Sequence, residues 1–216
     1  MVEALTEFEA AIAPGVSERE LLAVLAHGVL ARGAEYLATN TVCSGPNTNP
    51  WRAEATERAI EPGDLIYVDT DTVVEEGCFF CVSRTFACGG PSPDQRDTYR
   101  AAHEWLLDTI AQVRPGITCA ELAEAAPRIP DRYFPQRYEC MLHGVGLEEE
   151  SPSVCDPRDP QPNPDRVIQE DMVLVVETYM GEPGRDHGVK LGDVVHVTGA
   201  GAQVLAPYPY AATLLG

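Results

Sequence analysis

The stretch over residues 64–88, DLIYVDTDTVVEEGCFFCVSRTFAC, constrains this chain more than any other. Its apolar run leads directly into Asp69, and Asp71 follows two positions later. Side chains two residues apart on a strand point to the same face, so the pattern predicts a buried strand over 64–69 that ends in two adjacent carboxylates. Such a pair is costly to bury unless a cation or a proton lies between the charges. Two interpretations are open: a divalent metal site, and an acidic strand end that faces water.

Length and composition limit the class of protein. A chain of 216 residues with 44% hydrophobic side chains can build one compact domain over 1–216. Its net charge of -19 disfavours binding to nucleic acid or to anionic membrane surfaces. The sequence shows no apolar run of membrane-spanning length and no export signal, which predicts a cytoplasmic protein. Seven cysteines without a framework spacing predict reduced thiols.

Hydrophobic periodicity gives the secondary structure. It predicts helices over 3–13, 18–32, 93–113 and 119–126. Ser17 with Glu20, and Thr118 with Glu121, have the spacing of capping boxes at two of these helix starts. Strands are predicted over 36–43, 64–69, 78–86, 188–198 and within 172–184, with a hairpin turn at 75–77; residues 44–64, 127–140 and 151–166 read as irregular. Helices mixed with hairpins predict an α+β fold.

Two further residues have the chemistry of metal ligands. Glu177 follows an apolar run, VLVV, where an ionised carboxylate needs a partner unless the strand ends there and the side chain faces water. His143 begins the sequence HGVG, whose glycines allow a ligand to approach the backbone closely. A single histidine can equally be an ordinary hydrogen-bonded residue. Taken together, Asp69, Asp71, His143 and Glu177 form an oxygen and nitrogen ligand set from three segments.

Trp51 and a pair of cysteines allow alternative interpretations. Trp51 is a large apolar residue in a polar loop, and it either packs on the base of that loop or lines a pocket. Cys78 and Cys81 have the C-x-x-C spacing of redox or zinc sites. Both roles are disfavoured: the sequence has no second C-x-x-C, and residues three apart on a strand point to opposite faces, which works against a local disulfide.

The order of several motifs resembles the methionine aminopeptidase, prolidase and creatinase superfamily. These motifs are PGVSERELLAVL, EPGDLIYVDTD, SRTF, HGVGLEEESP, MVLVVETY and GVKLGDVVHVT, and they extend along essentially the whole chain. The resemblance implies the pita-bread fold, a curved antiparallel sheet flanked by helices. The sequence is most similar to the branch that includes dimethylsulfoniopropionate lyases and Xaa-Pro peptidase-like proteins. It implies a homodimer and a chain that lacks the N-terminal domain of those relatives.

The family binds two metal ions through five side chains, and the resemblance places four ligands here. The first aspartate falls on Asp69, with Asp71 as an additional ligand in the lyase-like branch. The histidine falls on His143 and the first glutamate on Glu177.

Two positions depart from the family's pattern. Cys81 stands where the family has its second aspartate, and Gly192 stands where it has its second glutamate. Asp193 is not a substitute for that glutamate, because a shift of one residue turns a side chain to the opposite face of the strand. We therefore expect one divalent ion rather than two, among Zn, Fe and Mn, with a Cys81 thiolate favouring zinc.

The resemblance implies a metal-dependent hydrolase with a depleted metal site that acts on a small peptide or amide-like substrate. Glu149 would move the proton, with His143 in the same catalytic set. An alternative is a lyase that cleaves a carbon–sulfur bond in dimethylsulfoniopropionate. There Tyr138 and Glu149 are the candidate bases, and Trp51 would line the pocket for the sulfonium cation. A third alternative is a non-catalytic protein of the same fold.

Overall fold

The computed structural model describes residues 1–51, 54–148 and 151–216. The helices are α1 (Val2–Ala11), α2 (Glu18–Leu30), α3 (Pro93–Gln112), α4 (Cys119–Ala125) and α5 (Ala212–Leu215), with 3₁₀ turns η1 (Gly45–Thr48) and η2 (Phe134–Gln136). The strands are β1 (Tyr36–Leu37), β2 (Thr41–Ser44), β3 (Leu65–Val73), β4 (Phe79–Ala87), β5 (Cys140–Gly144), β6 (Ser153–Cys155), β7 (Val173–Gly181), β8 (Gly188–Thr198) and β9 (Gly201–Val204).

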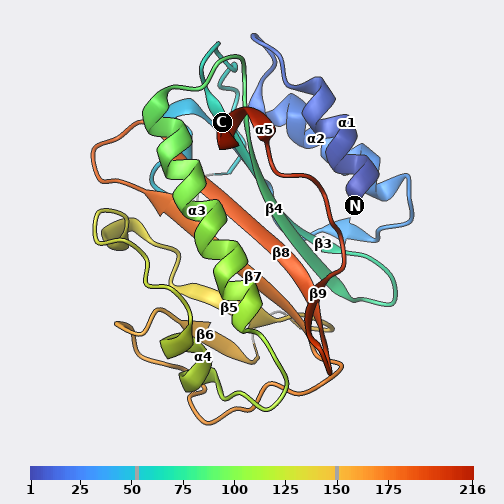
Figure 1. Cartoon of the computed structure of the whole chain (residues 1–216). Coiled ribbons are helices and arrows are strands. Elements are labelled where there is room, and N and C mark those ends of the chain that lie inside the picture. Colours follow the sequence, from blue (N-terminus) through green and yellow to red (C-terminus); the bar gives the residue numbers. More distant parts are fainter. Residues whose placement is uncertain (52–53, 149–150) are drawn as a thin grey trace.

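The described strands form one antiparallel sheet, which confirms the predicted α+β class. Its main path runs β1-β3-β4-β8-β7-β5-β6, with β2 beside β3 and β9 beside β8. The long central strands β7 and β8 cross the middle of the molecule, and α3 packs on them (Figure 1). The helices α1 and α2 lie beside the part of the sheet that contains β3 and β4. Strands from both halves of the sequence therefore meet at the β4–β8 contact, where Ser83 pairs with Gly192.

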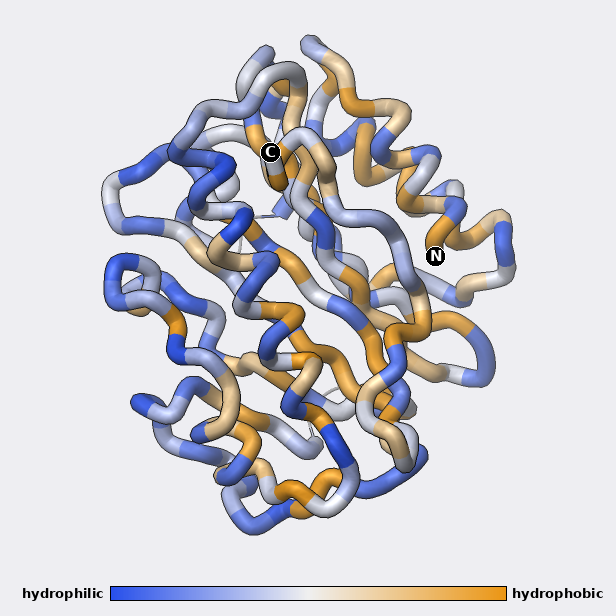
Figure 2. Tube along the Cα trace, viewed as in Figure 1, coloured by the Kyte–Doolittle hydropathy of each residue, from blue (hydrophilic) through white to orange (hydrophobic). Residues whose placement is uncertain are grey.

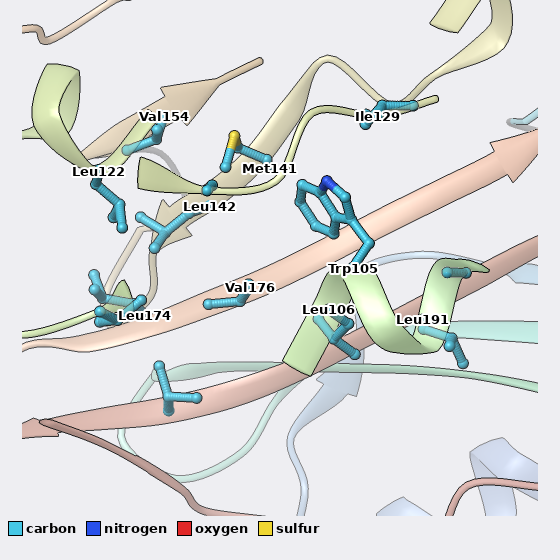
Figure 3. Packing of buried hydrophobic residues seen from close by; sticks show 14 of the residues in the cluster. Trp105, Leu106, Leu122, Ile129, Met141, Leu142, Val154, Leu174, Val176 and Leu191 are labelled. Atoms are coloured by element: carbon cyan, nitrogen blue, oxygen red, sulfur yellow. The ribbon is translucent and has the colours of Figure 1, made fainter. Parts of the chain in front are cut away.

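The helix α3 covers the sheet through a large apolar cluster. Its buried residues include Tyr99, Ala102, Trp105 and Leu106, and hydrophobic and hydrophilic residues alternate along its length (Figure 2). Trp105 and Leu106 lie beside Val176 of β7 and Leu191 of β8 (Figure 3). The Trp105 indole N–H also donates to the carbonyl of Pro127 at 2.6 Å, which satisfies the polar atom of a buried aromatic residue.

A second apolar cluster joins α1 and α2 to β3. Leu5 and Phe8 of α1 and Leu21 of α2 belong to the same buried group as Ile66 and Val68. These strand residues are even-numbered, and the alternation of a strand sends their odd-numbered neighbours to the opposite face. The carboxylate pair of β3 thus lies on the face away from these helices.

The helix starts agree closely with the capping patterns. Both predicted capping boxes are present, at Ser17 with Glu20 and at Thr118 with Glu121. The turn between β3 and β4 is also confirmed, with Glu76 and Gly77 at φ 56° and 77°. Glycine adopts such angles without the cost that a Cβ imposes, which explains its place at this turn.

Several predicted strand bounds are wrong. The strand predicted over 64–69 continues to Val73, so Asp69 and Asp71 lie inside β3 rather than at its end, because β4 pairs with it along its whole length. The segment 36–43 contains two short strands, each paired with β3. The loop predicted over 151–166 contains β6, which pairs with β5.

No disulfide joins the seven cysteines, all of which lie in the part of the chain that the structure describes. The part of the chain that the structure describes contains no helix with the length and apolarity needed to cross a membrane.

A buried glutamate fixes the long loop that precedes β3. Glu18 is fully buried at the start of α2, and its carboxylate accepts from the backbone N–H groups of Ser44 at 2.6 Å and Thr56 at 2.9 Å. The hydroxyls of Ser44 and Thr56 and the Asn47 amide donate to it as well. Ser44 and Thr56, which lie before and after Trp51 in the sequence, are thereby both attached to Glu18.

We expect Glu18→Ala to lower the free energy of unfolding by about 2–3 kcal/mol, because it leaves several buried donors without a charged acceptor. Urea denaturation measures the change. Glu20→Ala, which removes a more exposed capping carboxylate from the same helix, should cost only about 1 kcal/mol. Equal losses in the two variants would contradict this role for Glu18.

Candidate metal and catalytic site

Cross-strand register collects the polar residues of four strands on one face of the sheet. Residues directly opposite each other in an antiparallel pair share a face. The opposed pairs are Asp69 with Ser83, Asp71 with Cys81, Ser83 with Gly192, Glu177 with Gly192, and Tyr179 with Lys190. On β3 this face is opposite the one through which Ile66 and Val68 pack on α1 and α2, although Cys81 also contacts that apolar cluster.

Three of these residues form a carboxylate–thiol cluster, defined here as Asp69, Asp71 and Cys81. One ligand atom from each lies within 4.8 Å of the other two. Asp69 and Cys81 are buried and Asp71 is half-buried. The Cys81 thiol donates to Asp69 Oδ1 at 3.6 Å, and the Ser83 hydroxyl donates to the same oxygen. Asp71 is therefore the member of the cluster that is most accessible to solvent.

Burial and charge shift the pKa values in this cluster upwards. Burial, together with the negative charges of Asp71 and Glu177, raises the pKa of Asp69 to about 7, although Lys190 and Ser83 act against this rise. Burial and the surrounding carboxylates raise the pKa of the Cys81 thiol well above its ordinary value. The thiol is therefore protonated at neutral pH, and a metal ion would have to displace its proton.

Lys190 lies at the centre of this face and was not predicted as a site residue. It is 0% exposed, and its ammonium donates to Glu177 Oε2 and lies 3.8 Å from Asp69 Oδ2. The same nitrogen lies 4.5 Å from the ring centre of Trp51 and 4.2 Å from that of Tyr138, within the range of cation–π contacts. Burial alone would lower its pKa, but Asp69 and Glu177 raise it, so Lys190 is a cation at all ordinary pH values.

His143 and Glu177 form a buried pair. His143 Nε2 lies 3.2 Å from Glu177 Oε1, and its Nδ1 lies 3.0 Å from the carbonyl oxygen of Gly144. Both ring nitrogens thus face acceptors, which favours the doubly protonated imidazolium. Burial would lower the pKa of His143, but the hydrogen bond and charge of Glu177 raise it to about 9. Burial of Glu177 is in turn outweighed by Lys190 and His143, which lower its pKa to about 2.

The structure separates the two interpretations of Glu177 and of Trp51. Glu177 is 2% exposed in the middle of β7, so it does not face water at a strand end. Trp51 packs on the rings of Tyr67, Tyr138 and Tyr179, with ring centres 5.4, 5.6 and 5.7 Å away. It therefore covers the site face rather than the base of its own loop.

A pocket of about 470 Å³ opens beside these residues. Its lining includes Tyr138, Cys140, His143, Ser153 and Asn163. Tyr138 is common to this pocket and to the aromatic group around Lys190. Glu149, the predicted proton shuttle, lies outside the described residues.

The glycine at position 192, one of the two departures from the family pattern, has a clear structural consequence. Gly192 lies opposite Glu177 and supplies no ligand atom, and a Cβ there would lie 3.0 Å from the Cβ of Glu177 and 3.1 Å from Ser83 Oγ. Asp193 points away from this face, as expected, because its carboxylate accepts from Arg84 Nη2 at 2.6 Å and from the Tyr210 hydroxyl at 2.5 Å.

Sequence reasoning missed Lys190 and Ser83. One signal was available for Lys190: it is the only lysine among 15 basic residues, and it stands two positions before Gly192, on the same face of the strand. No comparable signal marked Ser83, whose role depends on its pairing with β3.

The donor set of the carboxylate–thiol cluster is chemically suited to hold a divalent ion. The cluster offers two carboxylate oxygens and one sulfur, which would leave a coordination position open on a four-coordinate ion. With its thiol ionised, the cluster would carry three negative charges, and Glu177 adds a fourth. These groups face two cations, Lys190 and the imidazolium of His143. A divalent ion at the cluster would bring the summed charge of these groups to zero.

Comparison with known proteins places the chain in a family. Residues 1–199 match metallopeptidase family M24. The dimethylsulfoniopropionate lyase DddP of Roseovarius nubinhibens is 35% identical over 203 residues, which cover 93% of this chain and 46% of that protein. The fold of this chain is similar to that of the dipeptidase PepE from Mycobacterium ulcerans, with TM-score 0.83, 27% identity and coverage of 96% of this chain and 55% of that one.

The Xaa-Pro dipeptidase from Bacillus anthracis is similar at TM-score 0.84 and 26% identity, over 96% of this chain and 57% of that one. The chain thus spans about half the length of the relatives that it matches. These likenesses confirm the predicted pita-bread fold, with an antiparallel sheet flanked by helices. From its match over residues 1–199, the chain belongs to metallopeptidase family M24.

Proposed function

We propose that this chain is a hydrolase that uses one divalent ion and acts on a small peptide or amide-like substrate. The observation that carries the proposal is the convergence of Asp69, Asp71 and Cys81 within 4.8 Å on the site face. A divalent ion held by these residues would supply Lewis-acid activation of a carbonyl group and of water. The half-buried Asp71 gives that position access to solvent.

The chain's own residues supply the rest of the chemistry. His143 lines the pocket of about 470 Å³ and carries a proton at neutral pH, so its positive charge would stabilise negative charge that develops on a bound substrate. Glu177 holds the ring of His143 in place through Nε2. Tyr138 lines the same pocket and forms the part of its wall that lies beside Lys190. The pocket volume suits a dipeptide-sized molecule.

Metal binding is the direct test of this proposal. We expect the chain to bind about one Zn²⁺ per molecule, and Cys81→Ser or Asp71→Asn to weaken that binding more than about tenfold, because even the loss of an outer-shell partner costs 10–100-fold. Equilibrium dialysis with plasma mass spectrometry measures both quantities. Cys78→Ser is the matched control, since Cys78 lies outside the cluster, and its affinity should be unchanged. Equal binding in all of these proteins would overturn the assignment.

A second candidate function is a lyase acting on a sulfonium substrate. It is favoured by the aromatic rings of Trp51 and Tyr138, which already surround a cation, and by the similarity to the lyase DddP. Tyr138 would then be the base near the substrate's α carbon. Burial raises the pKa of Tyr138, so this role would require a strong local cation to ionise the phenol.

One assay separates the two candidate functions. The zinc- and iron-loaded protein is incubated with a panel of Xaa-Pro dipeptides and, in parallel, with dimethylsulfoniopropionate. Release of free amino acids supports the hydrolase, and release of dimethyl sulfide supports the lyase. The absence of both products at high protein concentration, with one ion bound, would favour a non-catalytic protein.

A further inference from the structure

We propose that the ammonium of Lys190 is a tethered cation that fills the space between Glu177 and Asp69 and keeps a metal ion out of it. This inference extends the proposed one-ion site, but it stands on the contacts of Lys190 alone. It assigns to a side chain the role that a second ion would otherwise have to play, which is to compensate the buried carboxylates on this face.

The geometry around Lys190 is that of a built cation site. Its ammonium donates to Glu177 Oε2, lies 3.8 Å from Asp69 Oδ2, and is covered by the rings of Trp51 and Tyr138. Two carboxylates and two aromatic faces are groups that attract a cation of any kind. The side chain is 0% exposed, so bulk solvent does not reach the position in which its charge lies.

The surrounding strands show why the ammonium reaches this position. Lys190 is opposite Tyr179 on β7, and Gly192, the next residue on the same face of β8, is opposite Glu177. A Cβ at Gly192 would lie 3.0 Å from the Cβ of Glu177, closer than ordinary van der Waals contact, so a larger residue there would press on the side chain that Lys190 contacts. The missing side chain and the buried lysine are thus parts of one arrangement.

Removal of the ammonium should create a site for an added cation. In Lys190→Met, Glu177 and Asp69 lose their tethered charge, and we expect the variant to bind one further Zn²⁺ or Mn²⁺ per chain than the original protein does. Lys190→Arg retains the positive charge and is the matched control, with unchanged metal content. Plasma mass spectrometry after equilibrium dialysis gives the number of ions for each protein.

A second measurement is independent of metal affinity. Lys190→Ala removes a propylammonium group, so n-propylammonium chloride should raise the melting temperature of this variant by several degrees, and sodium chloride at equal ionic strength should not. The original protein should show no difference between the two salts. If Lys190→Met or Lys190→Ala is unfolded, divalent ions or n-propylammonium should restore the folded state.

The two proposals fail in different ways. If the original protein binds no divalent ion, the proposed one-ion site is wrong. If it binds one ion and Lys190→Met also binds one, and n-propylammonium has no effect on Lys190→Ala, the tethered-cation inference is overturned while the one-ion site stands.

Discussion

Replacing Arg84 by methionine should lower the free energy of unfolding by about 3–5 kcal/mol, because it leaves the buried carboxylate of Asp193 without its ion partner. Arg84 and Asp193 are each 1% exposed, and Arg84 Nη2 donates to Asp193 Oδ1 at 2.6 Å. Arg84 also donates to the carbonyl oxygens of Gly192 at 2.8 Å and Tyr208 at 2.9 Å. The guanidinium therefore joins β4, β8 and the C-terminal segment at the point where the site strands meet.

Denaturation in urea, followed by circular dichroism, measures this loss. Arg100→Met is the matched control, because the Arg100–Asp97 ion pair is exposed and should contribute no more than about 1 kcal/mol. The double variant Arg84→Met with Asp193→Asn should recover part of the stability, since no unpaired charge then remains buried. A loss in Arg84→Met as small as that in Arg100→Met would contradict the anchoring role.

The second large effect concerns Glu177, the acceptor that Lys190 and His143 share. We expect Glu177→Gln to cost about 3–5 kcal/mol, because two buried cations lose the anion between them. The double variant Glu177→Gln with Lys190→Met should be more stable than the sum of the single effects predicts, with a coupling energy of about 1–3 kcal/mol. All measurements are made with a chelator present, so that metal binding does not contribute.

The pKa of His143 gives a separate readout of the same contact. Next to Glu177 it is raised to about 9, against the effect of burial. The charge on this pair therefore stabilises the folded protein fully below the ordinary histidine pKa of about 6.5 and is lost as the pH rises through about 9. In Glu177→Gln, NMR titration should show the pKa of His143 falling below 6.5, since burial then acts without the carboxylate. An unchanged His143 pKa would contradict the assigned pairing.

Local sequence rules were most successful where one segment decides its own structure. The helix over residues 93–112 follows from its apolar spacing and from the Pro115 break beyond it, and the two predicted capping boxes form because each lies within four residues. The hairpin turn at 75–77 depends on the conformational freedom of Gly77 and was found in the same way. The bounds of β3 were not predicted correctly from its own sequence, because the strand ends where its pairing with β4 ends.

The sequence by itself determined which side chains are available: the aspartates two apart on an apolar strand, a glutamate inside another, and a glycine where the family has a ligand. Only the tertiary structure decided what each one contacts. Lys190 and Glu177 are 13 residues apart, and Lys190 and Asp69 come from strands that are separated by more than half the chain. Whether a buried carboxylate is compensated by a metal ion or by an ammonium depends on which charge the neighbouring strand brings beside it, and that neighbour is chosen by the packing of the whole sheet.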